Sequence, residues 1–261
     1  MYNFIDTIPN DNAKNALLSL QTVFNGFNLD ELLTDDTGRF VTLSVGGRGI
    51  LSKRMNITES PYQHGAREKG FTYDVREIPV KFLIEDKTSR GLRNRFNNLN
   101  AFLLGSKKRL EFTDEEAYFI ATLQSADIPD EESNSLVGTL IFVCTDPAKR
   151  KNSKEINVMD TDATHIISTQ GETPWSINVV FSEATNKFEF TASNGLYLLL
   201  NYTFVAGDRL QIDYVGRKVF LNGNDLRPTV SMSSNYVLLQ PGEVTLKASH
   251  DCDLIYDERY Y

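Results

Sequence analysis

The stretch GDRLQIDYVGRKVFLNGND (Gly207–Asp225) carries both turn residues and alternating apolar residues. A two-residue turn at Gly216–Arg217, with glycine in the first position, predicts a type II′ β-hairpin. In that register Tyr214 faces Val219, and every second residue on either strand lies on the same face. That face carries the apolar residues of both strands, namely Leu210, Ile212, Tyr214, Val219 and Leu221. The pattern therefore predicts a hairpin with one buried face.

The same register separates the aspartates of this stretch. Asp213 lies on the mostly polar face, whereas Asp208 and Asp225 lie at the far end of the hairpin on the other face. Two interpretations of Asp208 and Asp225 stay open. With oxygens of Asn222 and Asn224 they would surround a calcium ion, or they would flank the next turn, because like charges avoid direct opposition in a ladder. We favour the turn.

The remainder of the chain also reads mainly as short strands. Segments rich in β-branched, aromatic and leucine residues are separated by Gly, Asn, Asp or Pro clusters, for example RFVTLSV, SLVGTLIFVC and LYLLLNYTFV. This density of strands predicts a mainly β fold of sandwiches or barrels.

One helix is expected, over residues 89–104. Leu92, Phe96, Leu99 and Leu103 are spaced by four, three and four residues, which places them on one helical stripe. Thr88 or Ser89 can cap its beginning and Gly105 suits its end. The stripe should pack on a sheet of the same domain, and the opposite face should meet solvent or a partner.

Two further stretches before this helix predict local geometry. In FTYDVREIPVKFLI (Phe71–Ile84) the apolar residues move from odd to even positions, which predicts a bulge or kink around Glu77–Pro79. The glycine-rich SVGGRGILSKR (Ser44–Arg54) departs from the phosphate-loop pattern and is followed by an alternating segment. We expect a hairpin turn there.

A polar stretch near the middle of the chain divides it. TDPAKRKNSKEIN follows an apolar run that ends at Cys144 and precedes a new series of strands. We expect a first domain over residues 1–148, a linker over 149–157 and an all-β second domain over 158–261.

Composition excludes several classes of protein. No apolar run approaches the roughly 20 residues of a membrane helix, and the N-terminal residues lack the pattern of a signal peptide. The net charge of −8 argues against general nucleic-acid binding. The two distant cysteines, Cys144 and Cys252, are expected to be buried thiols, and the three scattered histidines do not form a zinc motif.

Charge is unevenly distributed along the chain. Residues 48–109 hold 14 Lys and Arg against 6 Asp and Glu, whereas residues 110–148 hold 9 acidic residues and no Lys or Arg. These are either two solvated faces of opposite sign or complementary surfaces of neighbouring copies in a head-to-tail ring. In the second case Arg90, Arg93 and Arg95 would lie on an inter-subunit surface.

We expect neither a catalytic residue nor a cofactor or metal. The acids of FTDEEAYF are more typical of a charged turn than of a glycosidase pair, and no serine lies in a nucleophile-elbow motif. Trp175 is the only tryptophan. We expect it in the core of the second domain, and the alternative is an exposed platform for a carbohydrate.

Several segments in a fixed order carry a resemblance to a known family. FTYDVREIPVKF precedes LRNRFNNLNAFL in the expected helix, and RLEFTDEEAYFIATL, LVGTLIFVCTDPAKR, the Gly207–Asp225 stretch and YVLLQPGEVTLKAS follow. Over nearly its whole length the chain resembles the distal tail proteins (Dit family) of long-tailed phages of Gram-positive bacteria.

The resemblance implies a structural protein of the virion tail tip, made in the host cytoplasm. Its N-terminal split-barrel or sandwich domain with one helix would assemble into a ring, a hexamer in this family, between the tail tube protein and the baseplate. A C-terminal galectin-like β-sandwich would dock receptor-binding or other baseplate proteins. A central tail-associated baseplate protein would continue below the ring, and DNA would pass through its channel. The alternative is a carbohydrate-binding protein that uses this sandwich for cell-wall polysaccharide.

Overall fold

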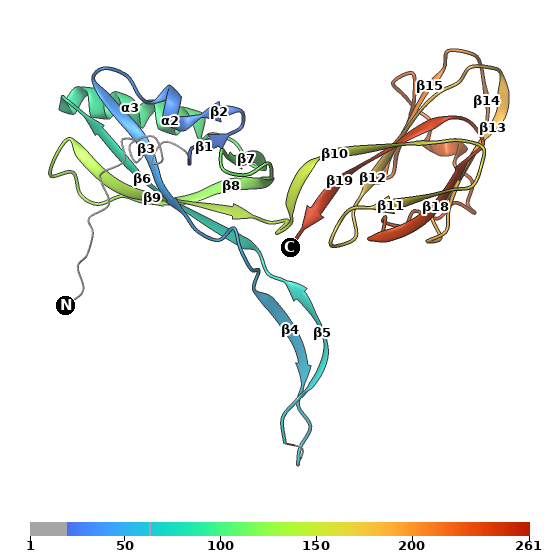
Figure 1. Ribbon diagram of the computed structural model, residues 1–261, viewed down its shortest axis with the longest axis horizontal. Helices are drawn as coiled ribbons and strands as arrows, with labels where there is room; N and C mark the ends of the chain where they lie inside the picture. The colour runs from blue at the N-terminus through green and yellow to red at the C-terminus, as the bar shows by residue number, and fades with distance from the viewer. Residues whose placement is uncertain (1–19, 63) are drawn as a thin grey trace, which may run out of the picture. The chain divides into compact units, whose positions relative to one another are not determined.

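The computed structural model describes residues 20–62 and 64–261. The chain divides into two compact units, Met1–Lys149 and Arg150–Tyr261 (Figure 1). Strands dominate both units, so the prediction of a mainly β protein is confirmed. No helix among the described residues has the length and the apolar character that crossing a membrane requires.

Over its described residues, the first unit contains two helices and nine strands. Its strands are β1 (Thr22–Phe24), β2 (Phe27–Asn28), β3 (Gly38–Val45), β4 (Lys53–Thr58), β5 (Arg67–Tyr73), β6 (Arg76–Asp86), β7 (Lys108–Phe112), β8 (Tyr118–Asp127) and β9 (Ser135–Cys144). The helices are α2 (Leu29–Leu32) and α3 (Ser89–Phe102).

Strand β8 turns a corner in this unit. Its first residues pair with β7, and from Thr122 onward it pairs with β9, with a register shift between Leu123 and Ser125. Pairing then continues from β9 to β6 and from β6 to β3 on one side, and from β7 to β1 and β2 on the other. The bent path encloses a core rich in phenylalanine, which includes Phe24, Phe40, Phe82, Phe112, Phe119 and Phe142.

One carboxylate connects β1 to β3, two strands that do not pair with each other. Asp30, in α2, accepts hydrogen bonds from the backbone N–H of Thr22 in β1 (2.9 Å) and of Thr42 in β3 (2.6 Å). The Thr42 hydroxyl donates to the same carboxylate at 2.7 Å and lies 2.8 Å from the Thr22 hydroxyl. Asp30 thus takes the place of ladder hydrogen bonds, because every buried backbone N–H needs an acceptor.

Helix α3 lies within the range expected for it. The side chain of Thr88 caps it by accepting from the N–H of Gly91 at 3.0 Å. Leu92, Leu99 and Leu103 are buried and Phe96 is partly buried, as their spacing predicts. Gly105 follows the helix with φ at 97°, in the left-handed region that glycine tolerates.

The second unit is a sandwich of two sheets. Its strands are β10 (Lys149–Val158), β11 (Ala163–Ile167), β12 (Trp175–Val180), β13 (Thr185–Ala192), β14 (Tyr197–Phe204), β15 (Arg209–Asp213), β16 (Lys218–Leu221), β17 (Asn224–Asp225), β18 (Gly242–Ala248) and β19 (Cys252–Tyr260), with a 3₁₀ turn, η1, at Arg227–Thr229. The larger sheet has the order β17-β16-β15-β12-β19-β10, and the four-stranded sheet has the order β11-β18-β13-β14.

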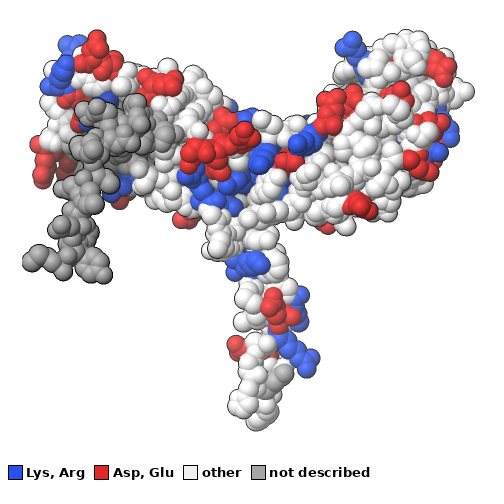
Figure 2. Space-filling model, in the orientation of Figure 1, with Lys and Arg blue, Asp and Glu red and all other residues white. Residues whose placement is uncertain are grey.

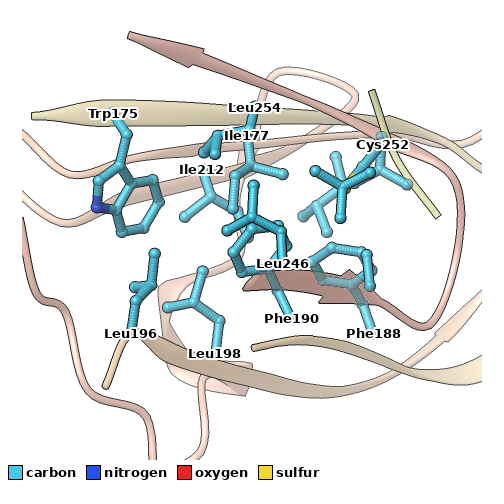
Figure 3. Packing of buried hydrophobic residues seen from close by; sticks show 14 of the residues in the cluster. Trp175, Ile177, Phe188, Phe190, Leu196, Leu198, Ile212, Leu246, Cys252 and Leu254 are labelled. Atoms are coloured by element: carbon cyan, nitrogen blue, oxygen red, sulfur yellow. The ribbon is translucent and has the colours of Figure 1, made fainter. Parts of the chain in front are cut away.

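The two sheets of the second unit enclose a dry core (Figure 3). Trp175, Ile177 and Ile212 project from the larger sheet toward Phe188, Phe190 and Leu198 of the four-stranded sheet. Cys252 belongs to this core and Cys144 to that of the first unit, and both are free thiols. Burial raises the pKa of Cys144 to about 11 and of Cys252 to about 12, so both thiols stay protonated and unreactive.

The Gly207–Asp225 stretch forms the hairpin β15–β16, but its predicted register is wrong by two residues. Asp213 pairs with Lys218, so the loop holds four residues and not two. Gly216 has the expected positive φ, 77°, and Arg217 also has a positive φ. Because a shift of two residues preserves the alternation of faces, the residues expected in the core remain there, with Tyr214 only partly buried.

Two local expectations in the first unit are wrong. Between Gly46 and Gly49 the chain makes no hairpin turn, because it continues from β3 into β4 and reverses only after Thr58. The point where the apolar residues move from odd to even positions is Asp74–Val75, between β5 and β6, and not Glu77–Pro79. Strand β6 pairs with β9 without a break from Arg76 onward.

The segment predicted as a linker is also a strand. β10 begins at Lys149 and lies beside β19 in the larger sheet. Ser153 donates a hydrogen bond to Asp257 of β19, and Asn157 donates to Asp253. The sequence did not predict this strand, because most of its residues are exposed and it therefore lacks alternating apolar residues.

Candidate functional site

The most exposed structured part of the first unit is the ribbon formed by β4 and β5, called the arm below. β4 and β5 pair only with each other and continue the strands β3 and β6, as Figure 1 shows. Nearly every residue of the arm is exposed. Side chains of Lys, Arg, Asp and Glu are all visible along it in Figure 2.

The two faces of the arm differ in chemistry. Met55 pairs with Phe71 and Lys53 with Tyr73, so these side chains share one face, and Ile57 continues it. Met55 is 54% exposed, Ile57 52% and Phe71 45%. The Lys53 ammonium lies 4.1 Å from the centre of the Phe71 ring. The arm is therefore a two-stranded ribbon with an uncovered apolar face.

The base of the arm is clamped by two arginines. Arg76 is 2% exposed and donates to the carbonyls of Gly47 (2.8 Å), Gly49 (3.1 Å) and Pro147 (2.8 Å). Desolvation by this burial lowers the pKa of the Arg76 guanidinium. Each of its hydrogen bonds fixes a backbone segment that lies outside the regular strands.

The second arginine, Arg48, binds the acidic turn between β7 and β8. Its guanidinium contacts Asp114 at 2.6 Å and Glu115 at 3.4 Å. The hydrogen bond from Arg48 lowers the pKa of Asp114. Lys149 pairs with Glu115 at 2.7 Å. Asp114 and Glu115 of FTDEEAYF therefore form ion pairs with basic side chains at the arm base, and not a pair facing an open cleft.

The three arginines expected on a shared surface lie in different environments. Arg90 and Arg93 are exposed on α3, and Arg93 forms an ion pair with Glu131. Arg95 is 5% exposed, so its assignment to a surface is wrong. Its guanidinium contacts Asp86 at 2.9 Å, Asp35 at 2.5 Å and the carbonyl of Leu33 at 2.5 Å.

Outward residues of three strands form an apolar row on the first unit. Val41 of β3 pairs with Leu83 of β6, and Leu83 pairs with Val137 of β9. Val137 is 42% exposed, and Leu43, beside the row, is 37% exposed. The opposite faces of these strands fill the core, so this row is an exposed apolar surface in its own right.

The structure does not support the two candidate sites of the second unit, the carbohydrate platform at Trp175 and the calcium site at Asp208 and Asp225. Trp175 is 3% exposed and donates its indole N–H to the carbonyl of Val237 at 2.8 Å, so it is a core residue and not a platform. Asp208 accepts from Asn222, whereas Asp225 pairs with Arg227. The described residues contain no group of three or more His, Cys, Asp or Glu side chains placed to hold a metal ion.

Comparison with known proteins connects this arrangement to one family. Residues 27–144 match the family model of the phage tail protein RIFT-related domain, and residues 168–260 match the C-terminal domain of siphovirus-type tail components. The distal tail protein of Bacillus phage SPP1 is 29% identical over 237 residues, which is 87% of this chain and 92% of that protein. The chain belongs to the Dit family of distal tail proteins.

Two solved structures of phage proteins have a similar fold. The crystal structure of the SPP1 Dit protein, described as a paradigm of the hub adsorption apparatus in phages infecting Gram-positive bacteria, superimposes with a TM-score of 0.81. It has 22% identity and covers 93% of this chain and 99% of its own. A chain of the phage P2 baseplate in its activated conformation with Ca gives a TM-score of 0.58, 10% identity and coverage of 92% and 98%.

The arm is the candidate functional element that the sequence did not reveal. Two signals for it are present: alternating apolar residues at Met55 and Ile57, and the matching alternation at Phe71 and Tyr73. They lie on either side of a Pro- and Gly-containing stretch that marks the true turn. The glycine run at residues 46–49 suggested a turn too early and concealed the pairing.

Proposed function

We propose that this Dit-family protein is a structural hub of a phage tail, in which copies assemble into a ring, a hexamer by family resemblance. The ring joins the tail tube to the baseplate at the distal tip of the virion. The main observation that supports this proposal is the arm, because its apolar face is exposed in a single copy. Exposed apolar ribbons of this kind mark contacts with another protein.

The occupant that fits the arm is a second copy of this chain. The row Val41–Leu83–Val137 offers apolar side chains on the outer face of the same unit that bears the arm. Because the arm and the apolar row are different surfaces, each copy can place its arm on one neighbour and bind the arm of another neighbour on its row. Such heterologous contacts close into a ring when the rotation between copies is right.

Charge complementarity supports the same arrangement. The exposed Arg90 and Arg93 are our proposed contribution to the inter-subunit or tail-tube surface, and Arg95 is no longer part of it. Asp127, Asp130 and Glu132 lie on the same unit, next to the Glu131 that pairs with Arg93 of its own copy, so acidic side chains are available to a basic surface on a neighbouring copy. Complementary charge of this kind sets register and partner choice more than affinity.

The other parts of the proposal rest on the relatives. A galectin-like second unit would dock receptor-binding or other baseplate proteins, a central tail-associated protein would continue the tail, and DNA would pass through the ring during ejection. The function is architectural, without catalytic residues or a cofactor. The protein would be made in the host cytoplasm and would end in the virion.

Sedimentation of the full-length chain at several concentrations, alone and with the tail tube protein, tests the ring. We expect Met55→Ser combined with Phe71→Ser to lower the association constant at least tenfold, because it removes apolar area from the arm face. Asn56→Ser combined with Thr72→Ser, on the opposite face, is the matched control and should associate like the wild type. A chain that stays monomeric in every mixture would refute the ring.

A further inference from the structure

A half-enclosed pocket lies on the outer face of the larger sheet in the second unit. It holds about 320 Å³, and its outward-facing side chains are Asn178, Val180, Arg209, Gln211, Phe220 and Asn222. Four of these six residues come from the Gly207–Asp225 hairpin. The volume is at the lower end of the range for small-molecule sites, and is enough for one compact ligand or one unit of a polymer.

Three polar side chains in this pocket have no hydrogen-bond or ion-pair partner among the described residues. Asn178 and Gln211 are direct neighbours in the pairing of β12 with β15, so their amides lie side by side. Within residues 20–62 and 64–261, neither amide has a hydrogen bond, and the Arg209 guanidinium has neither a hydrogen bond nor an ion pair.

Asn222 shows the contrast within the same pocket. Its side-chain oxygen accepts from the N–H of Arg209 at 2.9 Å, and its amide nitrogen donates to Asp208 at 2.8 Å. These bonds hold the rim of the pocket in place. The free donors and acceptors are therefore confined to Asn178, Gln211 and Arg209.

An apolar surface completes the pocket. Phe220 pairs with Gln211 across the hairpin, so its half-buried ring lies next to that amide. Val180 pairs with Arg209 and is 62% exposed. One row across β16, β15 and β12 thus holds the ring of Phe220 and the amides of Gln211 and Asn178, at the spacing of about 4.8 Å that separates strands in a sheet. Arg209 lies two residues from Gln211 along β15.

We propose that this pocket binds one saccharide unit of a polysaccharide. Primary amides both donate and accept, which suits paired hydroxyl groups that do the same. A ring face such as that of Phe220 packs against the C–H face of a pyranose. The free guanidinium of Arg209 recognises a carboxylate or phosphate on the sugar. This site lies within one copy and does not depend on the proposed ring.

Titration of the full-length protein tests the proposal, with ligand-observed NMR as the readout. The probes are cell-wall polysaccharide purified from a Gram-positive bacterium, glucose, glucuronate and glucose 6-phosphate. We expect saturable binding of the polysaccharide. Glucuronate or glucose 6-phosphate should bind more tightly than glucose, and the tighter of the two identifies the acidic group.

Variants at exposed positions decide whether this pocket is the site. Asn178→Ala and Gln211→Ala should each lower affinity at least tenfold, and Arg209→Gln should abolish the preference for the acidic sugar. Asn201→Ala truncates an exposed amide on the four-stranded sheet and should leave binding unchanged. Lack of binding by the wild type to every probe, or binding that survives Asn178→Ala and Gln211→Ala, would overturn the proposal.

Discussion

Asp30 is the residue on which closure of the first unit depends. Its two carboxylate oxygens accept one backbone N–H from β1 and one from β3. Desolvation raises the pKa of Asp30 above its ordinary value of 3.8, although the hydrogen bonds from Thr22 and Thr42 oppose this rise. A group with a raised pKa stabilises the fold most in its protonated form, below its ordinary pKa, and less as the pH rises through the folded-state pKa.

Asp30→Asn is expected to destabilise the first unit by about 2 kcal/mol. An asparagine has one oxygen in place of two, so either Thr22 or Thr42 keeps a buried N–H without an acceptor. Chemical denaturation of the full-length protein measures the change in free energy of unfolding. Asp36→Asn, at an exposed position, is the control. Equal stability of the two variants would contradict the role of Asp30 in connecting β1 to β3.

The contribution of Asp86 to the stability of the fold is expected to depend on pH in the opposite direction to that of Asp30. The backbone N–H of Thr88 and the guanidinium of Arg95 lower the pKa of Asp86 below 3.8. Its stabilising contribution is therefore present above pH 3.8 and is lost as the pH falls through the folded-state pKa. Calorimetry should show that Asp86→Asn is less stable than the wild type at neutral pH. The difference in stability between the two proteins should become smaller below pH 3.8. A difference that does not change with pH would argue against the ion pair of Asp86 with Arg95.

Arg95 shows what sequence reasoning cannot see at the scale of one residue. It lies on the buried side of α3 between Leu92 and Leu99, yet an arginine in a helical pattern reads as a surface position. Its partners Asp35 and Asp86 come from other elements of the fold. Only their convergence in three dimensions makes the position suitable for a buried cation.

At the scale of elements, the base of the arm depends on Gly47. Gly47 has φ at 74°, and a Cβ atom there would lie 1.9 Å from the carbonyl oxygen of Glu77. Gly65, beyond β4, has a similar φ of 79° with open space around it. A substitution would therefore cause the same left-handed backbone strain at both positions, and only at Gly47 would it also cause a clash.

Gly47→Ala is expected to displace the base of the arm, whereas Gly65→Ala should cost only about 1 kcal/mol of left-handed strain. Hydrogen exchange measures the difference. Amides of β4 and β5 should exchange faster in Gly47→Ala and at nearly wild-type rates in Gly65→Ala. Equal exchange in the two variants would contradict the role of the close approach to Glu77.

Elements with a strong local pattern were predictable from the sequence. The apolar stripe and the cap at Thr88 predicted α3, and alternation predicted both faces of the β15–β16 hairpin. Its exact register was not predictable, because loops of two and four residues place the same residues in the core. Strand β10 and the arm lack a buried face within one copy, so their patterns did not distinguish them from a linker and a turn.

At the scale of the whole molecule, the two units carry different parts of the account. The first unit bears the arm and the apolar row that we propose to join neighbouring copies. The second unit has a closed core, and its outer face bears the pocket proposed for a saccharide. Ring assembly and saccharide binding are thus expected to respond to separate sets of substitutions.

Disulfide cross-linking between copies tests the central claim most directly. Met55→Cys and Val137→Cys are purified separately, mixed and mildly oxidised, while the native Cys144 and Cys252 stay buried. The account predicts a covalent dimer, of two 29.5 kDa chains, that forms only in the mixture and not with either variant alone. A mixture that remains monomeric under non-reducing conditions, while the wild-type protein forms rings, would show that the arm does not bind this face of its neighbour.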